Sequence, residues 1–150
     1  MQLLGRRAAP IGIGAALVAG CIAVSGGTAG AGTDDAAVCQ GKKATIEGTS
    51  GRDVLVGTNQ RDVIQADVGN DVIRGRGGSD LICGHKGDDR IIGGDGKDDL
   101  RGRRGDDRIL GGPADDVLFG DPGDDQLDGG TGTDQCDTSI GFDTTQACES

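Results

Sequence analysis

The sequence has almost no aromatic residues: its 150 residues include two Phe and no Tyr or Trp. Aromatic and large aliphatic side chains bury the most area per residue, so a chain with so few of them is either disordered or built around a thin, repetitive core. Basic residues are also few, with 15 Lys and Arg against 25 Asp and Glu, and the formal net charge is −10. Nucleic acid binding needs a basic surface, so this composition argues against a nucleic acid partner and suits cations.

The motifs of common hydrolases and zinc proteins are missing as well. There is one histidine, His85, and no C-x-x-C pair, so a zinc site is not expected. Neither H-E-x-x-H nor G-x-S-x-G occurs. Paired aspartates such as Asp88-Asp89 and Asp106-Asp107 invite a catalytic interpretation, but the first of each pair is expected to face solvent. We therefore expect no catalytic activity, and we expect His85 to be an exposed loop residue.

The first 31 residues have the pattern of a signal peptide. Residues 1–7 (MQLLGRR) carry two arginines, residues 8–24 are small and apolar, and the Ala-Gly-Ala at residues 29–31 fits a cleavage site. This pattern predicts a secreted, extracellular protein. Two alternatives remain: residues 8–24 are just long enough for a membrane anchor, and Val-Ala-Gly before Cys21 resembles a lipobox, which would make the protein lipid-anchored at Cys21.

Glycine is abundant, with 31 residues, and it recurs with a period of nine. In blocks of nine that start at Gly48, such as GHKGDDRII and GRRGDDRIL, the first position is Gly in nine of the first ten blocks. The eighth position holds Leu or Ile through nine blocks and Cys136 in the tenth. The sixth position of the first ten blocks is always aspartate: Asp53, Asp62, Asp71, Asp80, Asp89, Asp98, Asp107, Asp116, Asp125 and Asp134.

This pattern resembles G-G-x-G-x-D-x-U-x, the repeat of the RTX, or haemolysin-type, calcium-binding family. The resemblance covers residues 48–146 and implies an all-β fold, a right-handed parallel β-roll (solenoid) of about ten nonapeptide repeats with short end caps. Two nonapeptides would form one coil, with alternate blocks stacked and the eighth-position residues between two sheets. Proteins of this family often carry proteases or lipases beside the repeats, but residues 32–47 leave no room for such a domain.

The resemblance also implies that Ca²⁺ lies between the stacked turns. Calcium prefers six to eight oxygen ligands, which carboxylates and the carbonyls of glycine-rich turns supply. The ten sixth-position aspartates are the predicted ligands, in one file of Asp53, Asp71, Asp89, Asp107 and Asp125 and another of Asp62, Asp80, Asp98, Asp116 and Asp134. Five aspartates in each file leave four gaps, so about eight ions is the ceiling. Since the core is thin and like charges stack, we expect the roll to fold only when calcium binds.

Some blocks depart from the repeat, and the ion sites beside them are the least certain. Gln60 and Ala114 replace the fourth-position glycine, and Ala66 replaces a first-position glycine. Thr49, Thr58 and Asp67 stand where a second glycine is preferred. We divide the chain into a signal peptide (1–31), an N-terminal linker and cap (32–47), the calcium-binding β-roll (48–137) and a C-terminal cap (138–150).

Four cysteines remain after removal of the signal peptide, and an even number in an exported chain predicts two disulfides. Four cysteines allow three pairings. We favour Cys136–Cys148, which are close in sequence, and hence Cys39–Cys83.

These features together predict a secreted calcium-binding repeat protein with calcium ions as its partners. The alternatives are an adhesin or structural protein in contact with the cell envelope, and an accessory module of an extracellular enzyme system.

Overall fold

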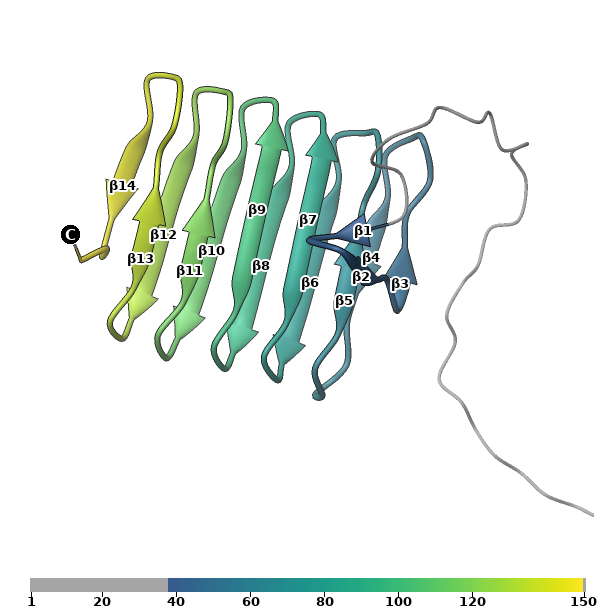
Figure 1. The fold of residues 1–150 in the computed structure, drawn as a ribbon, viewed down its shortest axis with the longest axis horizontal. Coiled ribbons are helices and arrows are strands. Elements are labelled where there is room, and N and C mark those ends of the chain that lie inside the picture. The colour runs from purple at the N-terminus through teal and green to yellow at the C-terminus, as the bar shows by residue number, and fades with distance from the viewer. Residues whose placement is uncertain (1–37, 150) are drawn as a thin grey trace, which may run out of the picture.

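The computed structural model describes residues 38–149, which form two facing six-stranded β-sheets (Figure 1). The sheet of odd-numbered strands, the odd sheet, consists of β3 (Ile46–Glu47), β5 (Val63–Gln65), β7 (Leu81–Lys86), β9 (Asp99–Arg104), β11 (Val117–Phe119) and β13 (Gln135–Asp137). The even sheet consists of β4 (Val54–Val56), β6 (Val72–Gly77), β8 (Arg90–Asp95), β10 (Arg108–Pro113), β12 (Gln126–Thr131) and β14 (Thr144–Gln146). A small antiparallel pair, β1 (Val38–Cys39) and β2 (Lys42–Lys43), precedes them.

From β3 onward the chain alternates between the two six-stranded sheets, and each strand pairs in parallel with the strand two places along the sequence. Partners are 18 residues apart, as in Ile73 beside Ile91 and Leu100 beside Leu118. One coil therefore contains two nonapeptides, and β3 and β14 extend the ten complete repeats to about six coils. The predicted all-β parallel solenoid is confirmed. Within residues 38–149, no helix is long and apolar enough to cross a membrane.

The core is a single layer of eighth-position side chains between the sheets. Each of them is 2% exposed or less: Ile64, Ile73, Ile82, Ile91, Leu100, Ile109, Leu118 and Leu127. Ile46, Leu55 and Cys136 pack against this row at its ends. Side chains alternate across a strand, so a three-residue strand points one residue inward and two outward. The thin core predicted from the sequence follows from this geometry.

Most turns are tight because their fourth-position residue has a positive φ. At Gly87 φ is 124°, and a Cβ there would come closer than 3.0 Å to the carbonyl oxygen of Gly69 in the preceding coil. Glycine satisfies both the conformation and the close approach. Ala114 adopts φ of 86° at the equivalent place, so this turn keeps its shape in strained form.

Two disulfides hold the ends of the roll, with the pairing predicted from the sequence. Cys39–Cys83 joins the β1–β2 hairpin to β7, with Cα atoms 5.7 Å apart. The hairpin covers the outer face of β5 and β7, where a second apolar cluster forms from Cys39, Val63, Leu81 and Cys83. Cys136–Cys148 joins β13 to the C-terminal segment, and β14 stacks on β12 as the last strand.

One structural expectation is wrong. His85 is not an exposed loop residue, because it lies within β7 and is 7% exposed. It stands at the second position of its repeat, which the coil geometry places in a strand rather than in the turn. The predicted signal peptide, cleavage site and Cys21 lie outside the described residues.

Candidate metal centre

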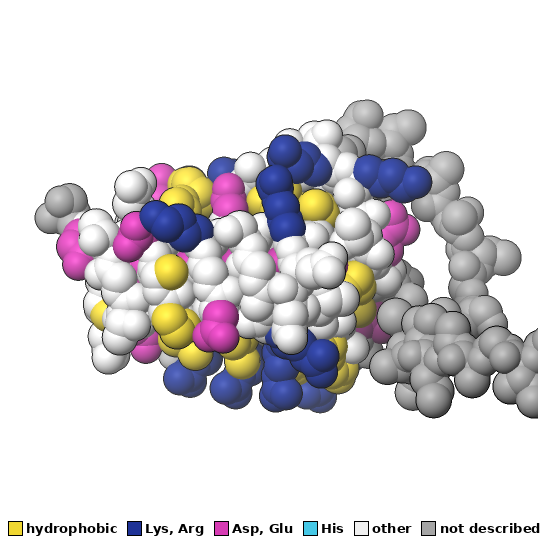
Figure 2. Space-filling model, turned by 90° about the horizontal axis from the view of Figure 1, so that it is seen from below, with side chains coloured by type: hydrophobic (Ala, Val, Ile, Leu, Met, Phe, Trp, Pro, Cys, Tyr) yellow, Lys and Arg dark blue, Asp and Glu magenta, His cyan; other side chains and the backbone are white. Residues whose placement is uncertain are grey.

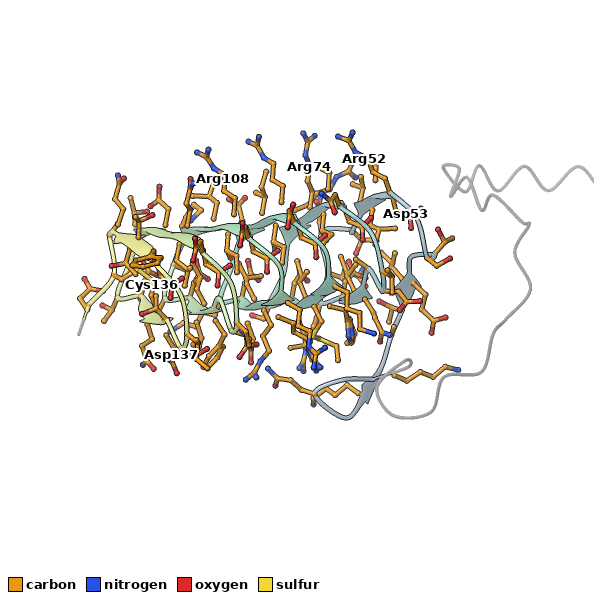
Figure 3. All side chains as sticks on the ribbon, turned by 90° about the horizontal axis from the view of Figure 1, so that it is seen from above. Arg52, Asp53, Arg74, Arg108, Cys136 and Asp137 are labelled. Atoms are coloured by element: carbon orange, nitrogen blue, oxygen red, sulfur yellow. A yellow bond between two sulfur atoms is a disulfide. The ribbon has the colours of Figure 1, made fainter. Side chains whose placement is uncertain are left out.

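The sixth-position aspartates form two files, one along each row of turns. Asp53, Asp71, Asp89, Asp107 and Asp125 follow one another at one edge, and the file continues to Asp143. Asp62, Asp80, Asp98, Asp116 and Asp134 follow one another at the other edge. The structure thus brings together the aspartates that the sequence grouped, and their assignment as calcium ligands stays a prediction. Figure 3 shows Asp53 at one end of the roll and Cys136 near the opposite end.

After the first coil, one carboxylate oxygen of each sixth-position aspartate accepts a hydrogen bond from the backbone of the preceding coil. From Asp71 to Asp143, Oδ1 accepts a hydrogen bond from the backbone N–H of the aspartate one coil earlier, with N–O distances of 2.7–2.9 Å. The backbone carbonyl of that earlier aspartate accepts from the N–H that follows the later one, as in Arg108 N to Asp89 O at 2.8 Å. Each aspartate is therefore fixed in direction by the neighbouring coil.

The other carboxylate oxygen has no partner through most of the roll. Oδ2 is buried without a hydrogen bond in seven aspartates: Asp71, Asp80, Asp89, Asp98, Asp107, Asp116 and Asp125. A buried, unsatisfied carboxylate oxygen is costly in free energy, and native structures contain few such atoms. Their recurrence in successive coils makes them a regular feature of the fold rather than isolated defects.

Backbone oxygens converge on the same space because the first position of each repeat is glycine. A Cβ built on Gly84 would come closer than 3.0 Å to Oδ2 of Asp89 and also to the carbonyl oxygen of Gly102 one coil later. Gly93 stands in the same relation to Asp98 and to the carbonyl of Gly111. Each such space therefore has a carboxylate oxygen and a carbonyl oxygen at its border, which is the donor type that calcium prefers.

The electrostatics of the files disfavour negative charge when no cation is present. Burial, together with the carboxylates of Asp89 and Asp125 in the adjacent coils, raises the pKa of Asp107 to about 8. Burial also raises the pKa of Asp89 and Asp98 to about 7, and that of Asp116 to about 6. Hydrogen bonds from the preceding coil offset only part of this effect. The buried carboxylates of the files are therefore favourable only when protons or cations neutralise their charge.

At the N-terminal end the second oxygen is already satisfied. The backbone N–H and hydroxyl of Thr49 donate to Oδ2 of Asp53 at 2.6 and 2.9 Å, and Thr58 does the same for Asp62 at 2.7 and 2.9 Å. Threonine replaces glycine at the second position of these repeats. The first two predicted ligands thus differ from the seven that follow.

At the C-terminal end, a residue that the sequence analysis missed completes one file. Oε2 of Glu149 accepts a hydrogen bond from the N–H of Asp134 at 2.5 Å, in the role that a following aspartate has elsewhere. Glu149 is 15 residues beyond Asp134, so it is out of the nine-residue register. The adjacent Cys148, with its predicted disulfide to Cys136, was the available signal that this segment turns back onto the last coil.

The fifth-position aspartates also form a row, although they are exposed. Oδ1 of Asp88 accepts from the N–H of Asp106 at 3.1 Å, and Oδ1 of Asp106 accepts from the N–H of Asp124 at 3.0 Å. The fifth-position residues on the other edge form a second row, in which Lys97 and Asp115 form an ion pair. The paired aspartates are thus two structural files side by side, one buried and one exposed.

Side chains alone do not complete a metal site. Among residues 38–149, no group of three or more His, Cys, Asp or Glu side chains is placed to hold an ion. A bound ion would need the turn carbonyls as well as the aspartates. Oxygen donors, unsatisfied carboxylates and small residues fit calcium, whose coordination is flexible in number and geometry.

Comparison with known protein families gives one result. The RTX calcium-binding nonapeptide repeat matches in four overlapping copies, at residues 47–82, 82–109, 102–136 and 110–144, which together cover more than half of the chain. No curated protein and no solved structure matches the chain.

Proposed function

Because this chain belongs to the RTX calcium-binding nonapeptide repeat family, we propose that it is a secreted protein whose β-roll folds when Ca²⁺ binds between the stacked turns, without catalytic activity. The observation that carries the proposal is the row of seven buried Oδ2 atoms without hydrogen bonds. Calcium supplies positive charge between these carboxylates. The described residues hold the aspartates in place through the backbone of neighbouring coils.

The residues that would hold the ions are the central aspartates of each file, together with the carbonyls of the first-position glycines. Asp53 and Asp62 are less suited, because Thr49 and Thr58 already satisfy them. Ala66 occupies the first position before Asp71, where a methyl group reduces the available space. We expect at most seven ions, one for each aspartate whose buried Oδ2 has no hydrogen bond. This number is below the ceiling of about eight that the sequence suggests.

Calcium titration of the full chain tests the proposal. We expect a largely disordered far-ultraviolet circular dichroism spectrum in chelator and a β spectrum at millimolar calcium, the range in which many extracellular modules bind. Magnesium should substitute poorly, because it requires smaller, near-octahedral sites. A chelated protein that keeps its cooperative β fold, or an equal response to magnesium, would contradict the proposal.

Export is the second part of the proposal, and it rests on the sequence of residues 1–31 and on the two disulfides, which persist in oxidising compartments. Mass spectrometry of the protein from the culture medium and from the cell envelope tests it. Secretion gives a chain that starts at Gly32, whereas lipid anchoring gives an acylated chain that starts at Cys21.

A further inference from the structure

We propose that the outer face of the odd sheet binds a saccharide-sized ligand that bears phosphate or sulfate groups. The site is a hollow of about 550 Å³ over β7, β9 and the segment after β11. Its lining includes Lys86, Arg101, Arg103 and Arg104, together with His85 and Asp121. The site lies outside the aspartate files and concerns a different ligand from calcium.

Basic residues gather on the outer sides of the sheets of this acidic protein. Figure 2 looks onto one turn edge and shows Lys and Arg side chains along both margins, with mostly backbone and uncharged polar or small side chains between them. The hollow combines four such side chains with a concave surface. Since the chain as a whole has a net charge of −10, an anion would be attracted to this place rather than to the molecule in general.

The register of the roll places like charges directly opposite each other at this site. Lys86 is the cross-strand partner of Arg104. Like charges in directly opposite positions destabilise a sheet. Within residues 38–149, neither Lys86 nor Arg104 forms an ion pair. An anion between the two strands would remove this repulsion.

The backbone at the same place is strained. His85 and Arg103 have φ of 81° and 84°, at the second position of their repeats, where glycine is preferred. In the even sheet Gly94 and Gly112 adopt left-handed φ at the same position, and Arg76 does so with φ of 82°, so the conformation belongs to the repeat. Strained backbone often accompanies binding sites, where the surrounding structure maintains it. Here the strain puts a cationic or titratable side chain where glycine would be more stable.

The orientation of the Arg101 guanidinium is fixed by its neighbours. Its guanidinium lies over the ring of Phe119, 4.1 Å from the ring centre, and its Nε is 3.6 Å from Oδ1 of Asp99. That Nε is buried and donates no hydrogen bond. Stacking on an aromatic ring fixes the plane of a guanidinium and leaves its terminal N–H groups available for an oxyanion.

The chemistry of the lining indicates the ligand. Guanidinium groups match phosphate and sulfate oxygens in paired hydrogen bonds, and four cations against Asp121 favour an anion of more than one charge. Asp121 gives the hollow an acceptor for a hydroxyl group, which a sugar supplies. The volume falls in the range of small-molecule sites, about 300–1,000 Å³.

The test is titration calorimetry on the calcium-bound full chain with sucrose octasulfate, glucose 6-phosphate and, as a neutral control, sucrose. The test variant is Lys86→Gln/Arg104→Gln. The matched control is Arg90→Gln/Arg108→Gln, which changes the net charge equally at a cross-strand pair of exposed residues on the opposite sheet. Figure 3 shows Arg108 pointing away from the odd sheet.

We expect at least one charged ligand to bind and sucrose to fail. The test variant should lose affinity by about tenfold or more, and the control variant should bind like the wild type. Preference for octasulfate or for glucose 6-phosphate identifies sulfate or phosphate as the recognised group. Circular dichroism in the same buffer separates loss of binding from loss of the calcium-dependent fold, and the test variant should keep its fold because like charges are removed. Failure of both charged ligands to bind, or equal losses in the two variants, would overturn the proposal.

Discussion

At the scale of the residue, Gly102 lies directly beside a buried carboxylate. A Cβ built on Gly102 would come closer than 3.0 Å to Oδ2 of Asp107. The φ of Gly102 is not left-handed, so only space and not conformation demands glycine there. We expect Gly102→Ala to cost about 1–3 kcal/mol of stability, as overpacking does, and to weaken calcium binding. Urea denaturation in calcium measures the loss.

Gly51→Ala is the control for this substitution. A Cβ on Gly51 would have Thr49 Oγ1 as its nearest neighbour, at 4.0 Å, and its φ is likewise not left-handed. Equal destabilisation by the two variants would show that glycine is needed for a reason other than the space beside the carboxylate.

Adjacent aspartates should respond differently to loss of charge. Asp107→Asn removes a buried carboxylate that two neighbouring ions would share, and each site adds about 1.4 kcal/mol at tenfold excess of calcium over its Kd. We therefore expect a loss of about 1–3 kcal/mol of calcium-dependent stability. Asp106→Asn should have little effect on calcium binding, because Asp106 is exposed and its Oδ1 acceptor is kept. The calcium concentration at half-folding measures both, and similar shifts would mean that the ligand assignment is wrong.

At the scale of the element, each disulfide fixes a different segment of the chain to the roll. Cys136–Cys148 spans 12 residues and keeps Glu149 against Asp134, whereas Cys39–Cys83 spans 44 residues and holds the β1–β2 hairpin on β7. In the chain-entropy model these loops contribute about 3 and about 4 kcal/mol, respectively.

We expect Cys136→Ser/Cys148→Ser to increase amide exchange mainly in β13 and β14. Cys39→Ser/Cys83→Ser should increase exchange in β5 and β7 instead. Hydrogen exchange in calcium, read by peptide, distinguishes the two patterns. Uniform exchange across the roll in either variant would contradict the assignment of each disulfide to one end.

The strands and their pairing follow from the period of nine, because aspartate, glycine and the inward residue repeat in phase. The period therefore predicted the stacking of Asp89 under Asp107 and the core position of Ile91. Glu149 was missed because it acts outside this register. His85 was misplaced because the strands extend into the first three positions of the next repeat, a boundary that glycine-rich sequence does not mark.

At the scale of the whole molecule, the files link folding to pH. The pKa of Asp107 is raised to about 8 and those of Asp89 and Asp98 to about 7, from an ordinary value of 3.8. The folded state thus binds these protons more tightly than the unfolded chain. The resulting stability is complete below the unfolded pKa and is lost as pH rises through about 7 to 8.

Without calcium, we expect more β structure at about pH 5 than at about pH 8.5. Because protons and calcium compete for the same carboxylates, the calcium concentration needed for folding should fall as pH rises. Circular dichroism in chelator and calcium titrations at several pH values measure the two effects. A calcium-free chain that loses structure on acidification would contradict the raised pKa values.

The hydrogen bonds along each aspartate file all run in one direction, from the N–H of the earlier coil to the carboxylate of the later one. A chain shortened from its N-terminal end leaves a carboxylate without its donor, and it also leaves a backbone N–H without its carbonyl acceptor, as Arg108 would be without Asp89. A chain shortened from its C-terminal end leaves a backbone N–H without its carboxylate acceptor, as Asp134 would be without Glu149. Orphaned buried N–H groups are rarer in proteins than under-satisfied oxygens. Removal of whole coils from either end should therefore be tolerated only when the new end is given a cap that supplies an acceptor.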